Sequence, residues 1–87
     1  MAILAPPDSH HYKAAEGWLE IGLAYEAVAE WDRLSPAARR FPRALDLRWR
    51  ISAALLDWDH GVEVGEQMVA LDPDSASGWL RLSFALR

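Results

Sequence analysis

Residues that begin or end helices divide this chain into five segments, and no segment alternates polar and apolar residues as a strand does. Pro6 and Pro7 precede the first segment, where Asp8 or Ser9 is the expected cap of a helix that continues to Gly22. The sequence therefore predicts an all-α chain of about five helices. The later four are expected over 24–34, 42–56, 57 or 59 to 72, and 75–87.

Apolar spacing supports the helical prediction. Six apolar residues recur at steps of three and four: Trp18, Ile21, Tyr25, Val28, Trp31 and Leu34. Such steps place side chains on one face of a helix. Ser35 and Pro36 interrupt the row and indicate a kink or a new helical start, because proline fits the first turn of a helix.

The chain also resembles itself when it is shifted by 34 residues, a period that is typical of helical repeat proteins. Under this shift Val28 falls on Val62 and Leu34 falls on Met68. The register holds without an insertion. The sequence therefore predicts two copies of one helix-pair unit and part of a third.

Two segments carry a resemblance to a known family. The residues over 58–61, 71–74 and Trp79 are similar to the second helix of a tetratricopeptide repeat (TPR), its closing Asp-Pro and the leading Trp of the next unit. The residues over 18–22 and 26–27 resemble the point where the two helices of a unit touch. The resemblance implies antiparallel helix-turn-helix hairpins stacked as a right-handed superhelix. It implies one domain over 1–87, with repeats over 8–41 and 42–75 and a partial repeat over 76–87.

Four positions depart from the family pattern. Gly61 and Gly65 stand where the family has Ala and an aromatic residue, Arg39 where it has Pro, and Trp49 where it has Gly or Ala. Trp31 is large where the second unit has Gly65. We interpret this difference as a paired change that conserves core volume.

Composition narrows the function classes. The net charge is −4, from 13 acidic and 9 basic residues with no run of like charges, so nucleic acid is not an expected partner. There is no cysteine, which excludes disulfides and thiolate metal sites. The apolar start is short and is broken by Pro6, so we expect no membrane partner and a soluble, cytoplasmic protein. Four of the five Trp are predicted to lie in the core.

No motif predicts catalysis. Adjacent His10 and His11 point to different sides of a helix and lack a third ligand at helical spacing, so no metal site is predicted. There is no Gly-x-Ser-x-Gly turn and no glycine-rich phosphate loop. The sequence therefore predicts a protein without catalytic residues and without a cofactor.

The resemblance implies a protein–protein interaction module, a scaffold or adaptor whose first helices line a concave groove for a peptide or helix. The residues carried over by position are Tyr12, Glu16 and Leu19, then Arg43, Asp46, Arg50 and Ala53, then Leu80, Arg81 and Phe84. They mix apolar anchors with arginines that can orient a partner. Of the positions that form a carboxylate clamp in some relatives, only Arg81 keeps its character, so a carboxylate-clamp co-chaperone is not expected.

Two features leave alternatives open. Arg39, Arg40 and Arg43 surround Phe41 and Pro42. These arginines either attract an acidic peptide or lie in a solvated loop between units. The last helix is apolar on nearly every side and is expected to be covered. Either the chain is a fragment of a longer protein or that helix meets a partner, and a homodimer through this helix is the alternative to peptide binding.

Overall fold

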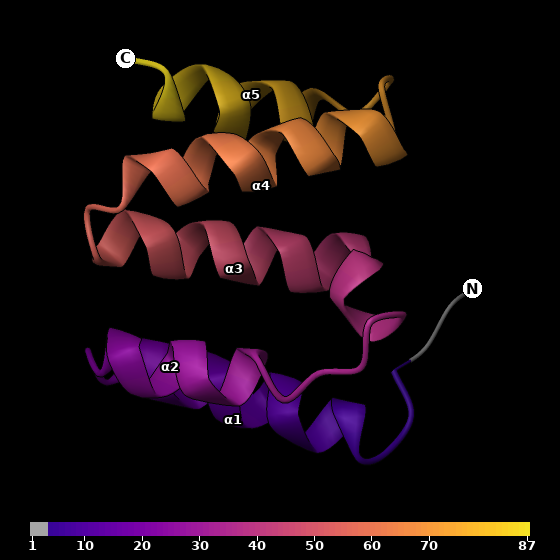
Figure 1. Cartoon of the computed structure of the whole chain (residues 1–87), viewed down its shortest axis with the longest axis vertical. Helices are drawn as coiled ribbons and strands as arrows, with labels where there is room; N and C mark the ends of the chain where they lie inside the picture. Colours follow the sequence, from indigo (N-terminus) through magenta and orange to yellow (C-terminus); the bar gives the residue numbers. More distant parts are fainter. Residues whose placement is uncertain (1–3) are drawn as a thin grey trace.

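The computed structural model describes residues 4–87, and these residues form helices and no strand (Figure 1). The prediction of an all-α chain with five helices is confirmed. The α-helices are α1 (Asp8–Glu20), α2 (Ala24–Trp31), α3 (Pro42–Ala54), α4 (Trp58–Leu71) and α5 (Ala76–Ala85), and a short 3-10 helix, η1 (Ala38–Arg40), precedes α3.

The helices are stacked in chain order, with α1 and α2 paired at one end, α3 in the middle, and α4 and α5 at the other end (Figure 1). The most extensive packing is between consecutive helices, α1 with α2, α3 with α4, and α4 with α5. The molecule measures 32 × 30 × 17 Å. Packed helices lie about 8–10 Å apart, so the shortest extent of 17 Å corresponds to about two layers of helices.

The turns after α1 and α3 have the same hydrogen bonds at equivalent positions of the two units. Each contains one residue in the left-handed conformation, Gly22 with φ 84° and Leu56 with φ 55°. This conformation favours glycine and costs a residue such as leucine about 1–2 kcal/mol. The closing bonds run from Leu23 N to Trp18 O and from Asp57 N to Ser52 O, and both are 2.9 Å long.

The core consists of two apolar clusters that share α3. Leu47 and Ile51 of α3 are fully buried in the first cluster, which also contains buried residues of α1 and α2 such as Ala15 and Ala27. Leu45 and Trp49 of α3 belong to the second cluster, together with Val64 and Met68 of α4. Helix α3 is thus covered on two sides and is the element that connects the two halves of the stack.

The prediction that four tryptophans lie in the core is wrong. Trp31 and Trp49 are buried, with 9% and 5% of their surface exposed, and Trp58 is half-buried. Trp18 and Trp79 are 36% and 52% exposed. Helical spacing identifies a face, but it does not reveal whether another helix covers that face.

The row of apolar residues over 18–34 does not form one buried face either, because it crosses the turn between α1 and α2. Ile21 and Tyr25, on either side of that turn, are 67% and 79% exposed. Helix α2 ends at Trp31, earlier than predicted, and Ser35 lies in the connection that leads to η1. The predicted interruption after Leu34 is therefore a new helical start rather than a kink.

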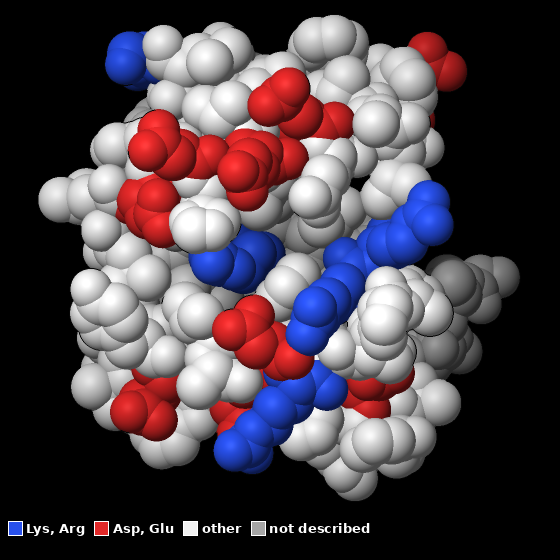
Figure 2. All heavy atoms as spheres, in the orientation of Figure 1, with Lys and Arg blue, Asp and Glu red and all other residues white. Residues whose placement is uncertain are grey.

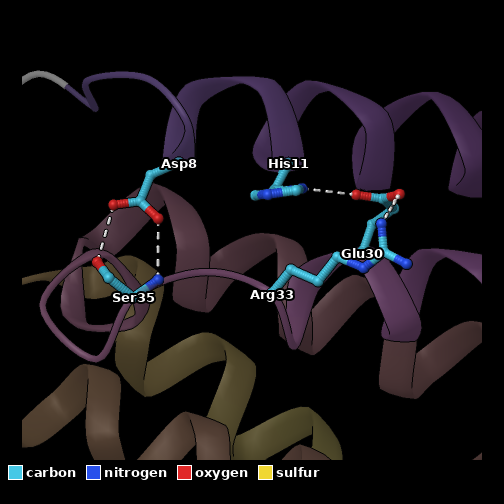
Figure 3. A network of polar contacts seen from close by, with 5 residues as sticks. All are labelled: Asp8, His11, Glu30, Arg33 and Ser35. Carbon is cyan, nitrogen blue, oxygen red and sulfur yellow. Dashed lines mark hydrogen bonds and ion pairs between the residues drawn. The ribbon is translucent and has the colours of Figure 1, made fainter.

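The prediction that Asp8 or Ser9 caps α1 is also wrong. Pro7 is in the cap position, and no side chain makes a capping hydrogen bond there. Asp8 instead accepts hydrogen bonds from the Ser35 backbone amide at 2.9 Å and from the Ser35 hydroxyl at 2.8 Å (Figure 3). Ser75, at the cap position of α5, makes no capping bond, whereas Asp57 caps α4 by accepting from the His60 amide at 3.3 Å.

A second polar contact joins α1 to α2 (Figure 3). His11 Nδ1 lies 2.9 Å from Glu30 Oε2, and Arg33 Nη1 lies 3.4 Å from the other oxygen of the same carboxylate. His11 is therefore engaged in a structural contact. Among residues 4–87, no three histidine or carboxylate side chains cluster as a metal site would require. No helix in this range has the length and apolar character needed to cross a membrane.

Candidate interaction groove

A shallow groove opens to solvent between α3 and α5, and the start of α4 contributes Trp58 to its lining. Its lining is mostly apolar. The lining residues are Trp49, Ala53, Leu56, Trp58, Ser77, Leu80, Arg81, Ser83, Phe84 and Arg87.

Three aromatic rings form the floor of the groove. The ring centroids of Trp49 and Phe84 are 5.6 Å apart, with the planes nearly perpendicular at 77°. Trp58 lies 5.6 Å from Phe84 and 6.3 Å from Trp49. These separations are within the range in which aromatic pairs attract each other beyond simple burial. Phe84 is 45% exposed, so the floor presents an ordered apolar surface to solvent.

Hydrogen bonds fix α5 to α3 along the groove. The Trp49 indole donates to the Arg81 carbonyl at 3.1 Å, and Arg81 Nε donates to Asp46 Oδ1 at 3.0 Å. The Arg81 guanidinium also lies 4.4 Å from the centroid of the Trp49 ring, which is a cation–π distance. Arg81 is therefore held in one position at the edge of the aromatic floor.

A row of ion pairs continues from Arg81 across α3 to α1. Asp46 Oδ2 lies 3.4 Å from Arg50 Nε, and Arg50 Nη2 lies 3.9 Å from Glu16. The Arg50 pairs are long, and its buried Nε lacks hydrogen-bond geometry to any partner. The Arg50 side chain is 40% exposed, so its guanidinium has donors free for an incoming acceptor.

The structure brings together six of the residues carried over from the family, and it places three elsewhere. Asp46, Arg50, Leu80, Arg81, Phe84 and Ala53 lie along the α3–α5 face. Tyr12 is buried beneath Arg43, whose guanidinium lies 4.9 Å from the ring centroid, and Leu19 packs half-buried against the first core cluster. Tyr12, Leu19 and Arg43 therefore do not line the groove. Asp46, Arg50 and Glu16 also lie outside the lining and are connected to it by the ion pairs that end at Arg81.

Sequence reasoning missed six lining residues, which are Trp49, Leu56, Trp58, Ser77, Ser83 and Arg87. A signal for Trp49 exists, because Asp46, Trp49, Arg50 and Ala53 are spaced by three and four and share one face of α3. Trp58 had no such signal, since it belongs to α4 and reaches the groove only through the tertiary turn after α3.

The fold gathers charges that are dispersed in the sequence. Figure 2 shows acidic side chains over α4 and a diagonal band of Lys and Arg across the lower half of the same face. Because the sequence has no run of like charges, it did not predict that charges of one sign would gather on this surface. Two arginines of the 39–43 segment make internal contacts: Arg39 lies over the Trp31 ring and donates to the Asp32 carbonyl, and Arg43 lies over Tyr12. These contacts favour a structural connection over a peptide site in that segment.

Comparisons with known proteins add no relative. No protein-family model matches the chain, and neither a similar characterised sequence nor a similar solved structure was found. A functional assignment therefore depends on the geometry of the groove and on the repeated contacts within the stack.

Proposed function

We propose that the chain is a protein–protein interaction module of the TPR type, which binds a peptide or helix of another protein in the α3–α5 groove. The observation that carries this proposal is the aromatic floor of Trp49, Trp58 and Phe84 beside Leu80, which is 68% exposed. A preformed apolar surface next to fixed polar groups is typical of binding sites.

Equivalent contacts in the two units support the TPR-type arrangement. Trp31 of α2 faces α3, where its indole donates to the Ala44 carbonyl at 2.7 Å. Gly65, the equivalent position in α4, faces α5 and meets the backbone of Leu82. In both units the second helix thus uses the same position to contact the first helix of the next unit. The unequal sizes of Trp31 and Gly65 set different helix spacings, so the two positions do not simply exchange volume.

The apolar floor and the charged residues of the groove would contribute to binding in different ways. An apolar side chain of the partner that covers the aromatic floor gains about 1.5–3 kcal/mol when it is fully buried. Arg87, which lines the groove and whose guanidinium lies 5.0 Å from the Phe84 centroid, supplies a cation beside the aromatic floor. Association itself costs at least about 4 kcal/mol, so two or three such anchors leave a net gain of at most about 5 kcal/mol, which corresponds to a dissociation constant of about 0.2 mM before polar contacts contribute.

The proposal assigns no catalytic residue and no cofactor. The pKa values of Asp8 and Asp57 are both lowered, chiefly by hydrogen bonds from Ser35 and His60. A lowered pKa weakens a carboxylate as a base, and these two carboxylates hold the ends of helices. Neither of them lines the groove.

The test compares two leucines on different sides of the same helix. Peptides are selected from a displayed random library against the wild type, and their affinities are measured by calorimetry for Leu80→Glu and Leu86→Glu. Both leucines are similarly exposed, at 68% and 64%, but only Leu80 lines the groove. We expect Leu80→Glu to weaken binding by about tenfold or more and Leu86→Glu to leave it within about twofold. Selected peptides that bind both variants as tightly as the wild type would contradict the proposal.

A further inference from the structure

The side of α5 turned away from the groove belongs to a second apolar surface, which we call the outer strip. Its residues are Trp79 and Leu82 of α5, Leu86 at the C-cap of that helix, and Val62 and Val69 of α4. Steps of three, four and seven residues place each set on one face of its helix. Trp79 and Leu86 are 52% and 64% exposed, and the other three are half-buried.

The two helices approach closely beneath the outer strip, so its two rows lie side by side. A Cβ added to Gly65 of α4 would lie 2.8 Å from Leu82 Cα, and one added to Gly78 of α5 would lie 3.3 Å from Val69 N. Val64 and Met68 occupy the flank of α4 that faces α3. Val62 and Val69 therefore lie on the opposite flank, away from the groove.

Trp79 is held in place before any partner binds. Its indole donates to the Pro73 carbonyl at 2.7 Å, across the turn that precedes α5. A large aromatic side chain that is exposed and already ordered loses little conformational freedom on binding, so more of its burial energy contributes to affinity.

The outer strip has an acidic border. Asp59, Glu63 and Glu66 follow one another at steps of four and three along α4, and all three are exposed. Figure 2 shows acidic side chains gathered over this helix. Residues 57–80 include no Lys or Arg. Within the described chain, none of these three carboxylates forms an ion pair.

The positive charges of α5 point elsewhere. Arg81 is bound to Asp46 on the groove side, and the Arg87 guanidinium lies over the Phe84 ring. The outer strip therefore combines apolar side chains with unpaired negative charge along one edge. A second copy of the chain fits this pattern poorly, because its own strip offers no Lys or Arg to pair with the acidic row.

We propose that the outer strip docks a basic amphipathic helix of another protein, with the apolar side of that helix on Trp79, Leu82 and Leu86 and its Lys or Arg residues toward Glu63 and Glu66. The stretch from Trp79 to Leu86 spans about 10 Å along α5, which matches anchors at i, i+3 or i+4, and i+7 of a partner helix. This surface is separate from the groove, so the inference stands apart from the proposed peptide function.

The probe is a synthetic amphipathic helix of Leu and Lys, with a peptide of the same composition in scrambled order as its control. Calorimetry on the full chain is expected to give a binding constant near micromolar for the helix and about tenfold weaker binding for the scrambled peptide. Leu86→Glu and Glu66→Lys should each weaken binding by about fivefold or more, and Leu80→Glu should leave it unchanged. The effect of Glu66→Lys should shrink as salt is raised.

Three results would overturn the inference. Equal binding of the scrambled peptide would mean charge attraction without docking. Loss of binding in Leu80→Glu with retention in Leu86→Glu would place the helix in the groove. Light scattering without peptide that finds a dimer, reduced to monomer by Leu86→Glu, would make a second copy the occupant of the outer strip. Because the two leucine variants act on different surfaces, failure here is distinguishable from failure of the peptide groove.

Discussion

Asp8 is a single side chain that serves a tertiary contact in place of a helix cap. Its carboxylate holds the backbone amide and the hydroxyl of Ser35, far along the chain, and so ties the start of α1 to the connection after α2 (Figure 3). The Ser35 amide is the largest cause of the lowered pKa of Asp8, followed by the Ser35 hydroxyl, while burial opposes them. The charged carboxylate is thus favoured in the folded state.

This contact makes a prediction about pH. Because the folded pKa of Asp8 is below the ordinary value of 3.8, the stabilisation is fully present above pH 3.8 and is lost as the pH falls through the folded pKa. We expect Asp8→Asn to unfold at a lower urea concentration than the wild type at neutral pH, and the difference to shrink below pH 3.8. Ser35→Ala removes only the hydroxyl and keeps the backbone amide, so it should lose a smaller part of this stabilisation. A difference that stays constant across the acid range would show that the charge of Asp8 is not involved.

At the scale of elements, the glycines of α4 decide how closely α5 can pack. The sequence marked Gly61 and Gly65 as unusual for the family, but it could not say which backbone they face. In the fold Gly65 faces Leu82, and Gly61 faces Ala85 with 3.4 Å available to an added Cβ. The packing of α5 therefore depends on the missing side chain of Gly65.

Gly65→Ala should lower the free energy of unfolding by about 2 kcal/mol, because its methyl group requires the backbone of α5 to move. Gly17→Ala is the matched control. An added Cβ at Gly17 meets nothing within 4 Å, so this change should raise the free energy of unfolding by about 0.5–1 kcal/mol through helix propensity. Urea denaturation of both variants makes the comparison. If Gly65→Ala is as stable as the wild type, α4 and α5 are farther apart than described.

The positions of the helices could be predicted because proline, glycine and aspartate punctuate the sequence at their ends. The tertiary contacts that each helix makes could not be predicted in this way. Leu56 adopts the left-handed conformation that Gly22 adopts at the equivalent turn of the first unit. Only the alignment of Gly22 with Leu56 in the two units indicates this conformation. The number of buried tryptophans was overestimated because some, such as Trp79, lie on a face that no helix within residues 4–87 covers.

At the scale of the whole molecule, α3 and α5 create the candidate site together. The residues carried over from the repeat include Asp46, Arg50, Arg81 and Phe84, and the structure places these four along the adjoining faces of α3 and α5. The same reasoning failed for Tyr12, whose ring turns into the core beneath Arg43. The choice between a buried and a surface position depends on the local helix rotation, which residue spacing alone does not fix.

The five indole N–H groups report on separate parts of this molecule. Trp49 and Trp58 lie at the groove, Trp79 lies on the outer strip, and Trp31 is buried with its indole bound to the Ala44 carbonyl. Trp18, on α1, is exposed away from both surfaces. Binding at either surface should therefore leave a distinct pattern.

The most direct test of the peptide-binding proposal is a proton–nitrogen NMR titration of the chain with a selected groove peptide. We predict that the indole signals of Trp49 and Trp58 shift together with peptide concentration, while those of Trp18, Trp31 and Trp79 keep their positions. Shifts confined to Trp18 or Trp79, with Trp49 and Trp58 unmoved, would contradict the assignment of binding to the α3–α5 groove.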